Sequence, residues 1–327
     1  MMSAVNLQQK HLHHGLSNRD IIKQMIYLDF FNLNKDPFSL TPDTRFFLNS
    51  SYFKEALETL IIAINNGEGF IKITGEVGTG KTLLCRKLLT SFSDNIITAY
   101  IPNPNISPEA LTYALAKELN IKLPSQQTEY VIQQLISQRL IHYYNAGKQV
   151  ILCIDEAQSM PDKTLEGLRL LTNLETEKSK LLHVVLFGQP ELNEKLASRD
   201  LRQLRQRVSF SYDLKRLEFD TLIEYLTHRL MTAGYYGGEL FQLSALKLLY
   251  RYSRGIPRLV NVITHKALIL CYGKGQHQIT RSIMKQAIAD TEDAYIDNKR
   301  KNISFWISAP VIVLAIAISL YFSGLFA

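Results

Sequence analysis

Eight consecutive residues in the first third of the chain combine glycines with a lysine and a hydroxyl group. Glycines let the backbone curl so that several N–H groups point at one anion. At this spacing, Lys81 would reach the β- and γ-phosphates of a nucleotide, and the Thr82 hydroxyl would coordinate Mg²⁺. The run therefore predicts a phosphate-binding loop for ATP and Mg²⁺, formed by Gly75, Glu76, Val77, Gly78, Thr79, Gly80, Lys81 and Thr82. A glycine turn without a ligand is the alternative.

Some 70 residues downstream of this loop, the segment VILCIDEA is a continuous apolar run that ends in two acidic residues. Asp155 at the end of such a strand would hold Mg²⁺, directly or through water. Glu156 is placed to polarise an attacking water as a general base. Because an Asp is joined by a Glu, the pair favours hydrolysis over simple nucleotide storage. An acidic strand end that faces solvent is the alternative.

Gln189 ends the next apolar run, LFGQPEL. In a parallel sheet it would lie beside the phosphate loop, where its amide could orient the water or contact the γ-phosphate. A turn formed by Gly-Gln-Pro, with no catalytic role, is the alternative.

Three arginines complete the candidate set, two in the run SRDLRQLRQRV and one in SRGIPRLVN. In the first run, Arg205 and Arg207 are the best candidates for an arginine finger into a neighbouring subunit, although the run also fits a solvated basic face or a nucleic-acid patch. In the second, Arg258 stands in the first turn of a helix that begins at Pro257. A cation there opposes the helix dipole, which favours a bound phosphate opposite it. An ordinary solvated arginine is the alternative for Arg258.

The elements that carry these residues alternate between strands and helices. Apolar residues at helical spacing predict an amphipathic helix over 51–65. Ser107 and Pro108 predict the start of another helix, and a longer one covers about 128–146. Buried strands are expected at GFIKITG, IITAYI, QVILCI and LLHVVLFG, with an outer strand at VSFSYDL. This alternation is typical of an α/β fold with a parallel sheet.

The predicted organisation has six parts. They are a disordered arm (1–24), an N-terminal segment and helix (25–66), an α/β core (67–214), a helical lid of about four helices (215–292), a basic linker (293–302) and a transmembrane segment (303–327).

The last 25 residues contain no charged side chain. A helix of that length spans about 37 Å, enough for a bilayer core of about 30 Å. Lys299, Arg300 and Lys301 precede it and predict that this side faces the cytoplasm. We therefore expect a C-terminal anchor in a bacterial inner membrane, with the nucleotide site in the cytoplasm.

Composition adds weaker limits. The net charge of +7 over 327 residues is mild, and fits acidic lipid headgroups as well as nucleic acid. The three cysteines, Cys85, Cys153 and Cys271, are far apart and are typical of buried apolar residues in a reducing compartment. No apolar stretch typical of a signal peptide occurs in residues 1–24.

Taken in order, GEVGTGKT, CIDEAQ, FGQPEL, LRQLRQR and GIPRL resemble the AAA+ ATPases of the general secretion pathway A (ExeA) type. YLDFFNLNKDPFSLTPDTRFF resembles the N-terminal signature of that family. Two longer segments, around the phosphate loop and before Gln189, are similar to its MSHA-pilus biogenesis members. The resemblance covers about 25–292.

The resemblance implies an α/β AAA+ P-loop NTPase with a helical lid, nucleotide at a subunit boundary, and a homo-oligomer. It also implies inner-membrane partners in a type IV-like pilus or a secretion apparatus. Related transposition and initiator ATPases share the motif set and keep a DNA-engaging regulator open, although no helix-turn-helix or aromatic-basic surface supports nucleic-acid binding. A nucleotide switch that acts as a scaffold without hydrolysis is a further alternative.

Overall fold

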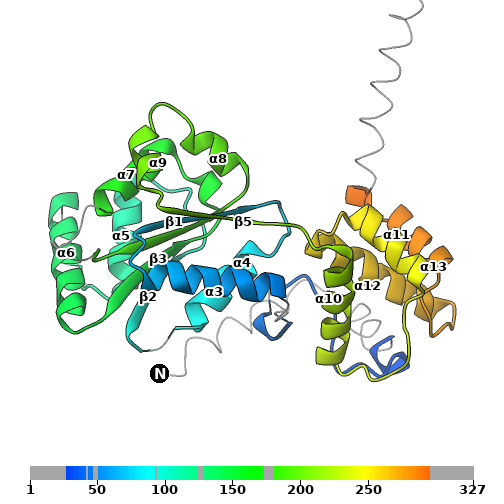
Figure 1. Cartoon of the computed structure of the whole chain (residues 1–327). Helices are drawn as coiled ribbons and strands as arrows, with labels where there is room; N and C mark the ends of the chain where they lie inside the picture. The colour runs from blue at the N-terminus through cyan, green and yellow to red at the C-terminus, as the bar shows by residue number, and fades with distance from the viewer. Residues whose placement is uncertain are drawn as a thin grey trace, which may run out of the picture. The chain divides into compact units, whose positions relative to one another are not determined.

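The computed structural model describes residues 27–41, 43–46, 51–92, 94–123, 128–172 and 180–294 (Figure 1). The predicted arm, most of the predicted linker and the predicted transmembrane segment lie outside these ranges. Within them, none of the helices is both long enough and apolar enough to cross a membrane. The described residues form two compact units: unit 1 holds 27–38, 234–255 and 259–294, and unit 2 holds 39–233 and 256–258.

Unit 2 is built on a five-stranded sheet in which every pairing is parallel, in the order β2-β3-β4-β1-β5. Each predicted strand is confirmed. β5 lies at an edge, and exposed and covered residues alternate along it, as predicted for an outer strand. The strands are β1 (Phe70–Gly75), β2 (Ile96–Ile101), β3 (Gln149–Ile154), β4 (His183–Gly188) and β5 (Phe210–Leu214).

Helices cover both faces of this sheet (Figure 1). Alternate residues of β3, such as Val150 and Leu152, join an apolar core with the helices that follow β2, β3 and β4. Cys153 points to the other face, where its free thiol lies within hydrogen-bonding reach of the free thiol of Cys85 on α4. Both thiols are buried. The helices of unit 2 are α3 (Ser51–Asn65), α4 (Lys81–Thr90), α5 (Pro108–Glu118), α6 (Glu129–Asn145), α7 (Asp162–Leu171), α8 (Glu191–Leu196), α9 (Arg202–Arg207) and α10 (Phe219–Thr232).

The predicted helix starts have the expected local chemistry. α5 begins at Pro108, and the Ser107 hydroxyl accepts a hydrogen bond from the Ala110 N–H at 3.2 Å. A side chain at this position satisfies one of the N–H groups that a helix start leaves unpaired. The sequence around residue 107 therefore determines where this helix begins.

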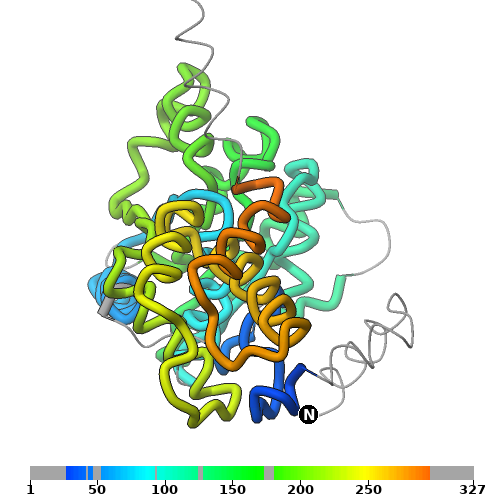
Figure 2. The backbone as a smooth tube through the Cα atoms, turned by 90° about the vertical axis from the view of Figure 1, so that its right-hand side faces the viewer, coloured from blue at the N-terminus to red at the C-terminus, as the bar shows by residue number. Residues whose placement is uncertain are grey.

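Unit 1 is helical and also contains the N-terminal segment 27–38. Its helices are α11 (Leu243–Ser253), most of α12 (Pro257–Gly273) and α13 (Arg281–Ala289). Together with α10, they are the four helices expected after the sheet. Figure 2 shows the N-terminal segment in blue beside the yellow and orange helices of this unit. Phe30 stacks on His277, with ring centres 4.2 Å apart, and meets the Tyr272 ring edge-on at 5.3 Å.

A partly buried carboxylate, that of Asp36, links this segment to α12 within unit 1. Asp36 Oδ1 accepts the Phe38 N–H at 2.9 Å and lies 3.5 Å from His265 Nδ1 on α12. Burial by itself would raise the pKa of Asp36, but the nearby His265 and Tyr27 side chains and the Phe38 N–H together lower it below its usual range. The ionised form is therefore the one that unit 1 stabilises.

We expect Asp36→Asn to lower the thermal stability of the protein at pH 7. Removing a charged hydrogen-bond acceptor of this kind costs about 1.5–3 kcal/mol. Because the folded-state pKa is depressed, the stabilisation is full above the unfolded-state value of about 3.9 and is lost as the pH falls through the folded-state value. Thermal midpoints from pH 7 down to pH 3 should therefore converge for wild type and variant below about pH 4.

Asp29→Asn is the matched control, because Asp29 is exposed on the same short segment. It should leave the midpoint within about 1 °C of wild type at every pH. A constant gap between Asp36→Asn and wild type down to pH 3 would contradict the assignment of the stabilisation to the ionised carboxylate.

Candidate functional site

The loop Gly75–Thr82 joins the end of β1 to the start of α4. Gly78 and Gly80 have φ values of +82° and +101°, which side chains other than glycine rarely adopt. A Cβ on Gly75 would lie 2.8 Å from the Leu214 carbonyl oxygen, and one on Gly78 would lie 2.7 Å from the Arg258 Cβ. The glycines are therefore required by the fold of the loop, and α4 offers its positive N-terminal end to the same place.

Lys81 lies inside this loop. Its Nζ donates to the carbonyl oxygens of Gly75 at 2.7 Å and Glu76 at 3.0 Å, and the residue is 5% exposed. Burial lowers the pKa of Lys81, while the carboxylates of Glu156 and Asp155 oppose that shift. The ammonium group is thus held by the same backbone that would surround a phosphate.

Asp155 follows β3 and is 2% exposed. Burial raises the pKa of this carboxyl, although hydrogen bonds from the Thr82 hydroxyl and the Glu156 N–H oppose the shift. The Glu156 N–H lies 3.0 Å from Asp155 Oδ1. A buried carboxylate bonded to a hydroxyl is an oxygen pair of the type that Mg²⁺ prefers when phosphate oxygens and water complete its shell. These residues fit Mg²⁺ and a nucleoside triphosphate.

Glu156 occupies the left-handed region, with φ 52° and ψ 37°. For a residue other than glycine this conformation costs roughly 1–2 kcal/mol. The turn aims its carboxylate at the end of β4, where Gln189 Nε2 donates to Glu156 Oε2 at 3.1 Å. Gln158 Nε2 donates to the same oxygen at 2.6 Å. The predicted base and the predicted water-orienting amide are therefore in direct contact.

The strand order explains this contact. β4 lies between β1 and β3, with Thr74 opposite Gly188 and Ile154 opposite Leu186. Since carboxyl ends of parallel strands meet at one edge, Gln189 emerges between the phosphate loop and the acidic pair. This edge brings together three separate stretches of the sequence, which contribute Lys81 and Thr82, Asp155 and Glu156, and Gln189.

Comparison with known proteins agrees with this geometry. The family described as AAA domain matches residues 64–196. General secretion pathway protein A of Aeromonas hydrophila is 40% identical over 254 residues, which are 78% of this chain. The chain belongs to the AAA proteins of the general secretion pathway A type. It spans less than half of the relative's length, 46%.

Solved structures share the AAA fold at low identity. Cdc6p of Pyrobaculum aerophilum has a TM-score of 0.60 at 17% identity, covering 78% of this chain and 70% of its own. ORC2 of Aeropyrum pernix has a TM-score of 0.56 at 14% identity, with 78% and 71% covered. RuvB of Thermotoga maritima has a TM-score of 0.53 at 19% identity, with 84% and 82% covered. These matches confirm the predicted α/β P-loop fold.

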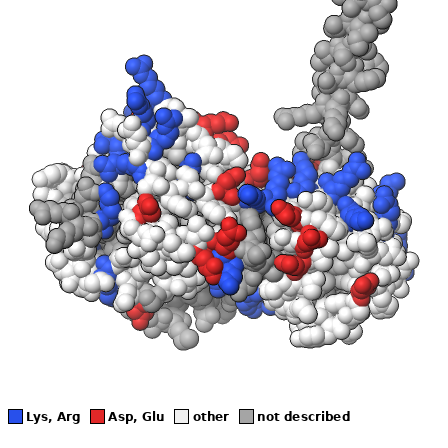
Figure 3. All heavy atoms as spheres, in the orientation of Figure 1, with Lys and Arg blue, Asp and Glu red and all other residues white. Residues whose placement is uncertain are grey.

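The three predicted arginines lie in different surroundings. The Arg258 N–H donates to the Gly78 carbonyl oxygen at 3.2 Å, and the residue is exposed at the start of α12. Arg207 Nη1 donates to the Thr172 carbonyl oxygen at 3.3 Å within the same chain. Arg205 is exposed on α9, and Figure 3 shows Lys and Arg side chains gathered over the part of unit 2 that carries α7 and α9. This arrangement favours Arg205 over Arg207 as a residue that reaches a neighbour.

Several polar residues of the site have no recognisable signal in the sequence. The Gln158 amide donates a hydrogen bond to the Glu156 carboxylate. Lys195 Nζ on α8 donates to the carbonyl oxygen of Gln158, at 3.2 Å, and to that of Met160. Arg216 Nη2 lies 3.3 Å from Glu76 Oε1 in the phosphate loop. In the sequence, Gln158 is marked only by its position two residues after Glu156, and nothing near Lys195 indicates its partner.

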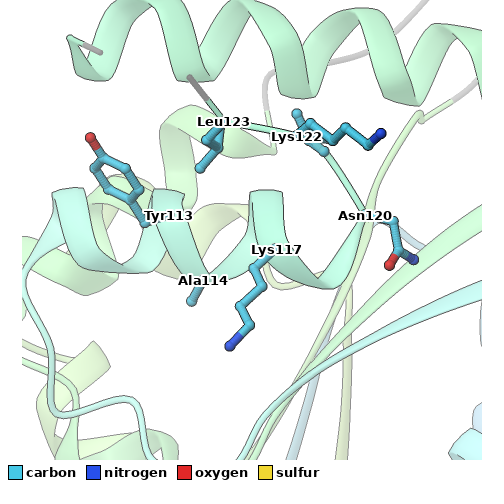
Figure 4. A pocket seen from close by; sticks show the side chains of 7 residues that line it. Tyr113, Ala114, Lys117, Asn120, Lys122 and Leu123 are labelled. Atoms are coloured by element: carbon cyan, nitrogen blue, oxygen red, sulfur yellow. The ribbon is translucent and has the colours of Figure 1, made fainter. Parts of the chain in front are cut away.

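A pocket of about 600 Å³ lies elsewhere in unit 2, along α5 and the segment that follows it (Figure 4). Tyr113 and Lys117 from α5 and Lys122 and Leu123 from the segment line it. None of the predicted site residues contributes to it, so the candidate site is defined by the sheet edge and not by this pocket.

Proposed function

We propose that this chain binds ATP with Mg²⁺ at the Gly75–Thr82 loop and hydrolyses it. The observation that carries this proposal is the convergence of the ends of β1, β3 and β4. There the Glu156 carboxylate accepts a hydrogen bond from the Gln189 amide, and the Asp155 carboxylate accepts one from the Thr82 hydroxyl. Lys81 and the loop N–H groups would bind the phosphates, and Thr82 and Asp155 would hold Mg²⁺. When bound, the metal would neutralise the negative charge that develops on the phosphate oxygens.

The remaining residues of the site have separate roles in hydrolysis. Glu156 takes a proton from the attacking water, and Gln189 orients that water or contacts the γ-phosphate. Arg258, beside Gly78, faces the phosphates from the first turn of α12. Arg205, with Arg207 as the second candidate, stabilises the transition state in a neighbouring subunit of a homo-oligomer. Such a finger supplies about 10³–10⁵ in rate where it operates.

We further propose that the ATPase works at the bacterial inner membrane, in assembly of a type IV-like (MSHA) pilus or a type II-like secretion apparatus. The 40% identity with general secretion pathway protein A supports the secretion class. The pilus alternative rests on the resemblance of the segments around the phosphate loop and before Gln189. The uncharged segment 303–327, preceded by Lys299, Arg300 and Lys301, supports a membrane anchor.

Co-purification tests the biological part of this proposal. Full-length chain is recovered from membranes, in parallel with Lys81→Ala and with Lys163→Ala, an exposed lysine on α7, as the matched control. Inner-membrane pilus or secretion components should co-purify with wild type and control, and their recovery should change several-fold with Lys81→Ala. Recovery of DNA, with ATPase activity that DNA stimulates and salt suppresses steeply, would instead support a DNA-engaging regulator.

A further inference from the structure

Gln158 joins two parts of the site through the two ends of one amide. Its Oε1 accepts the Gln189 backbone N–H at 3.0 Å, at the end of β4. Its Nε2 donates to Glu156 Oε2 at 2.6 Å. The opposite amide orientation would put an NH₂ group against an N–H donor and an oxygen against a carboxylate, so the two partners fix the orientation of the amide.

The backbone under Gln158 is also held. Gln158 lies in the short 3₁₀ turn Ala157–Ser159. Lys195 Nζ donates to its carbonyl oxygen at 3.2 Å and lies 3.5 Å from Asp162 Oδ1 at the start of α7. Gly188 lies against the same amide, because a Cβ there would lie 2.6 Å from Leu192 Cδ2 and 3.4 Å from Gln158 Oε1. The amide therefore has a defined position between β3, β4 and α8.

The consequence for Glu156 is a fixed carboxylate orientation. One oxygen, Oε2, receives both the Gln158 and the Gln189 side-chain amides. With that oxygen bound by two donors, the group presents Oε1 as the oxygen that can accept a proton from water. A displacement of the base by about 1 Å costs on the order of 10²-fold in rate.

We propose that Gln158 is a positioning residue for hydrolysis, which aims Glu156 Oε1 at the attacking water and couples the end of β4 to the base. It acts through Glu156 and makes no contact with the nucleotide. When Gln189 responds to the γ-phosphate, the bond from the Gln189 N–H to Gln158 transmits that movement to the Glu156 carboxylate. This inference rests on the proposed ATPase activity.

The test is Gln158→Met, which keeps the length of the side chain and removes both polar ends. Its kcat for ATP should fall about 10- to 100-fold, since Gln189 still provides one donor to Glu156. The Kd for a fluorescent ATP analogue, measured with Mg²⁺, should stay within about twofold of wild type. Gln134→Met is the matched control because Gln134 is exposed on α6, and its kcat should be unchanged.

Combination with Glu156→Gln separates positioning from a general structural role. If Gln158 acts through the Glu156 carboxylate, Gln158→Met should cause no further loss of single-turnover rate in the Glu156→Gln background. An equal loss in both backgrounds would overturn the inference, as would a Gln158→Met protein with wild-type kcat. A rise in analogue Kd together with a thermal midpoint several degrees lower would also overturn it.

The wild-type protein distinguishes failure of this inference from failure of the proposed function. If wild type does not hydrolyse ATP, the ATPase proposal fails before Gln158 is tested. If wild type hydrolyses ATP and loses activity with Lys81→Ala, but retains it with Gln158→Met, only the positioning role fails.

Discussion

Glu156→Gln should reduce ATP hydrolysis about 10²- to 10⁴-fold while the protein still binds ATP. The substitution removes the group that accepts the water proton, a step that contributes this range in enzymes. An amide of the same shape can still accept hydrogen bonds from Gln158 and Gln189, so the turn after β3 should persist. Turnover is measured by phosphate release, and binding by retention of labelled ATP through gel filtration.

Glu239→Gln is the control for this experiment, since Glu239 is an exposed glutamate in unit 1. It should hydrolyse ATP at the wild-type rate. If Glu156→Gln turns ATP over as fast as the control, Glu156 is not the base. If it no longer binds ATP, the substitution has disturbed the site and the role of Glu156 as a base loses its support.

Lys81→Ala should lower kcat/KM for ATP by about 10³-fold or more, and should weaken nucleotide binding as well. A positioned cation at a transferring phosphate stabilises both the bound nucleotide and the charge that develops during transfer. The effect on binding distinguishes this variant from Glu156→Gln. Isothermal titration with a non-hydrolysable ATP analogue and steady-state phosphate release measure the two parts.

Truncation of Lys81 also leaves the carbonyl oxygens of Gly75 and Glu76 without their Nζ donor. Lys81→Met leaves the same two oxygens without a donor, but it keeps the buried apolar stem and so avoids the cavity that alanine leaves; it serves as the second variant. Both variants should lose activity, with thermal midpoints near that of Lys163→Ala. Retained ATP turnover in either folded variant would show that hydrolysis occurs elsewhere or in a contaminant.

Local signals in the sequence were sufficient for the elements of the fold. The glycine positions of the phosphate loop, the Ser107–Pro108 helix start and the apolar strands are all determined within a few residues, by backbone freedom, capping and burial. For the same reason the motif residues Lys81, Thr82, Asp155 and Glu156 could be identified from spacing alone. The arginines could not be ranked, because exposure of Arg205 and the bond from Arg207 to Thr172 depend on α7 and α9 packing together.

The contacts inside the site needed the tertiary structure. The prediction that Gln189 lies beside the phosphate loop assumed a parallel sheet of the right strand order. Nothing local to FGQPEL indicates that β4 inserts between β1 and β3, since strand order depends on which distant strands pair. That order brings Gln189 to Glu156. It also gives Gln158 a second partner, Gln189, 31 residues away, besides Glu156, two residues away. The sequence by itself thus determined a nucleotide-binding loop and an acidic pair. Only the folded sheet decided how the acidic pair is held, because hydrogen bonds between strand ends join residues that sequence spacing does not relate.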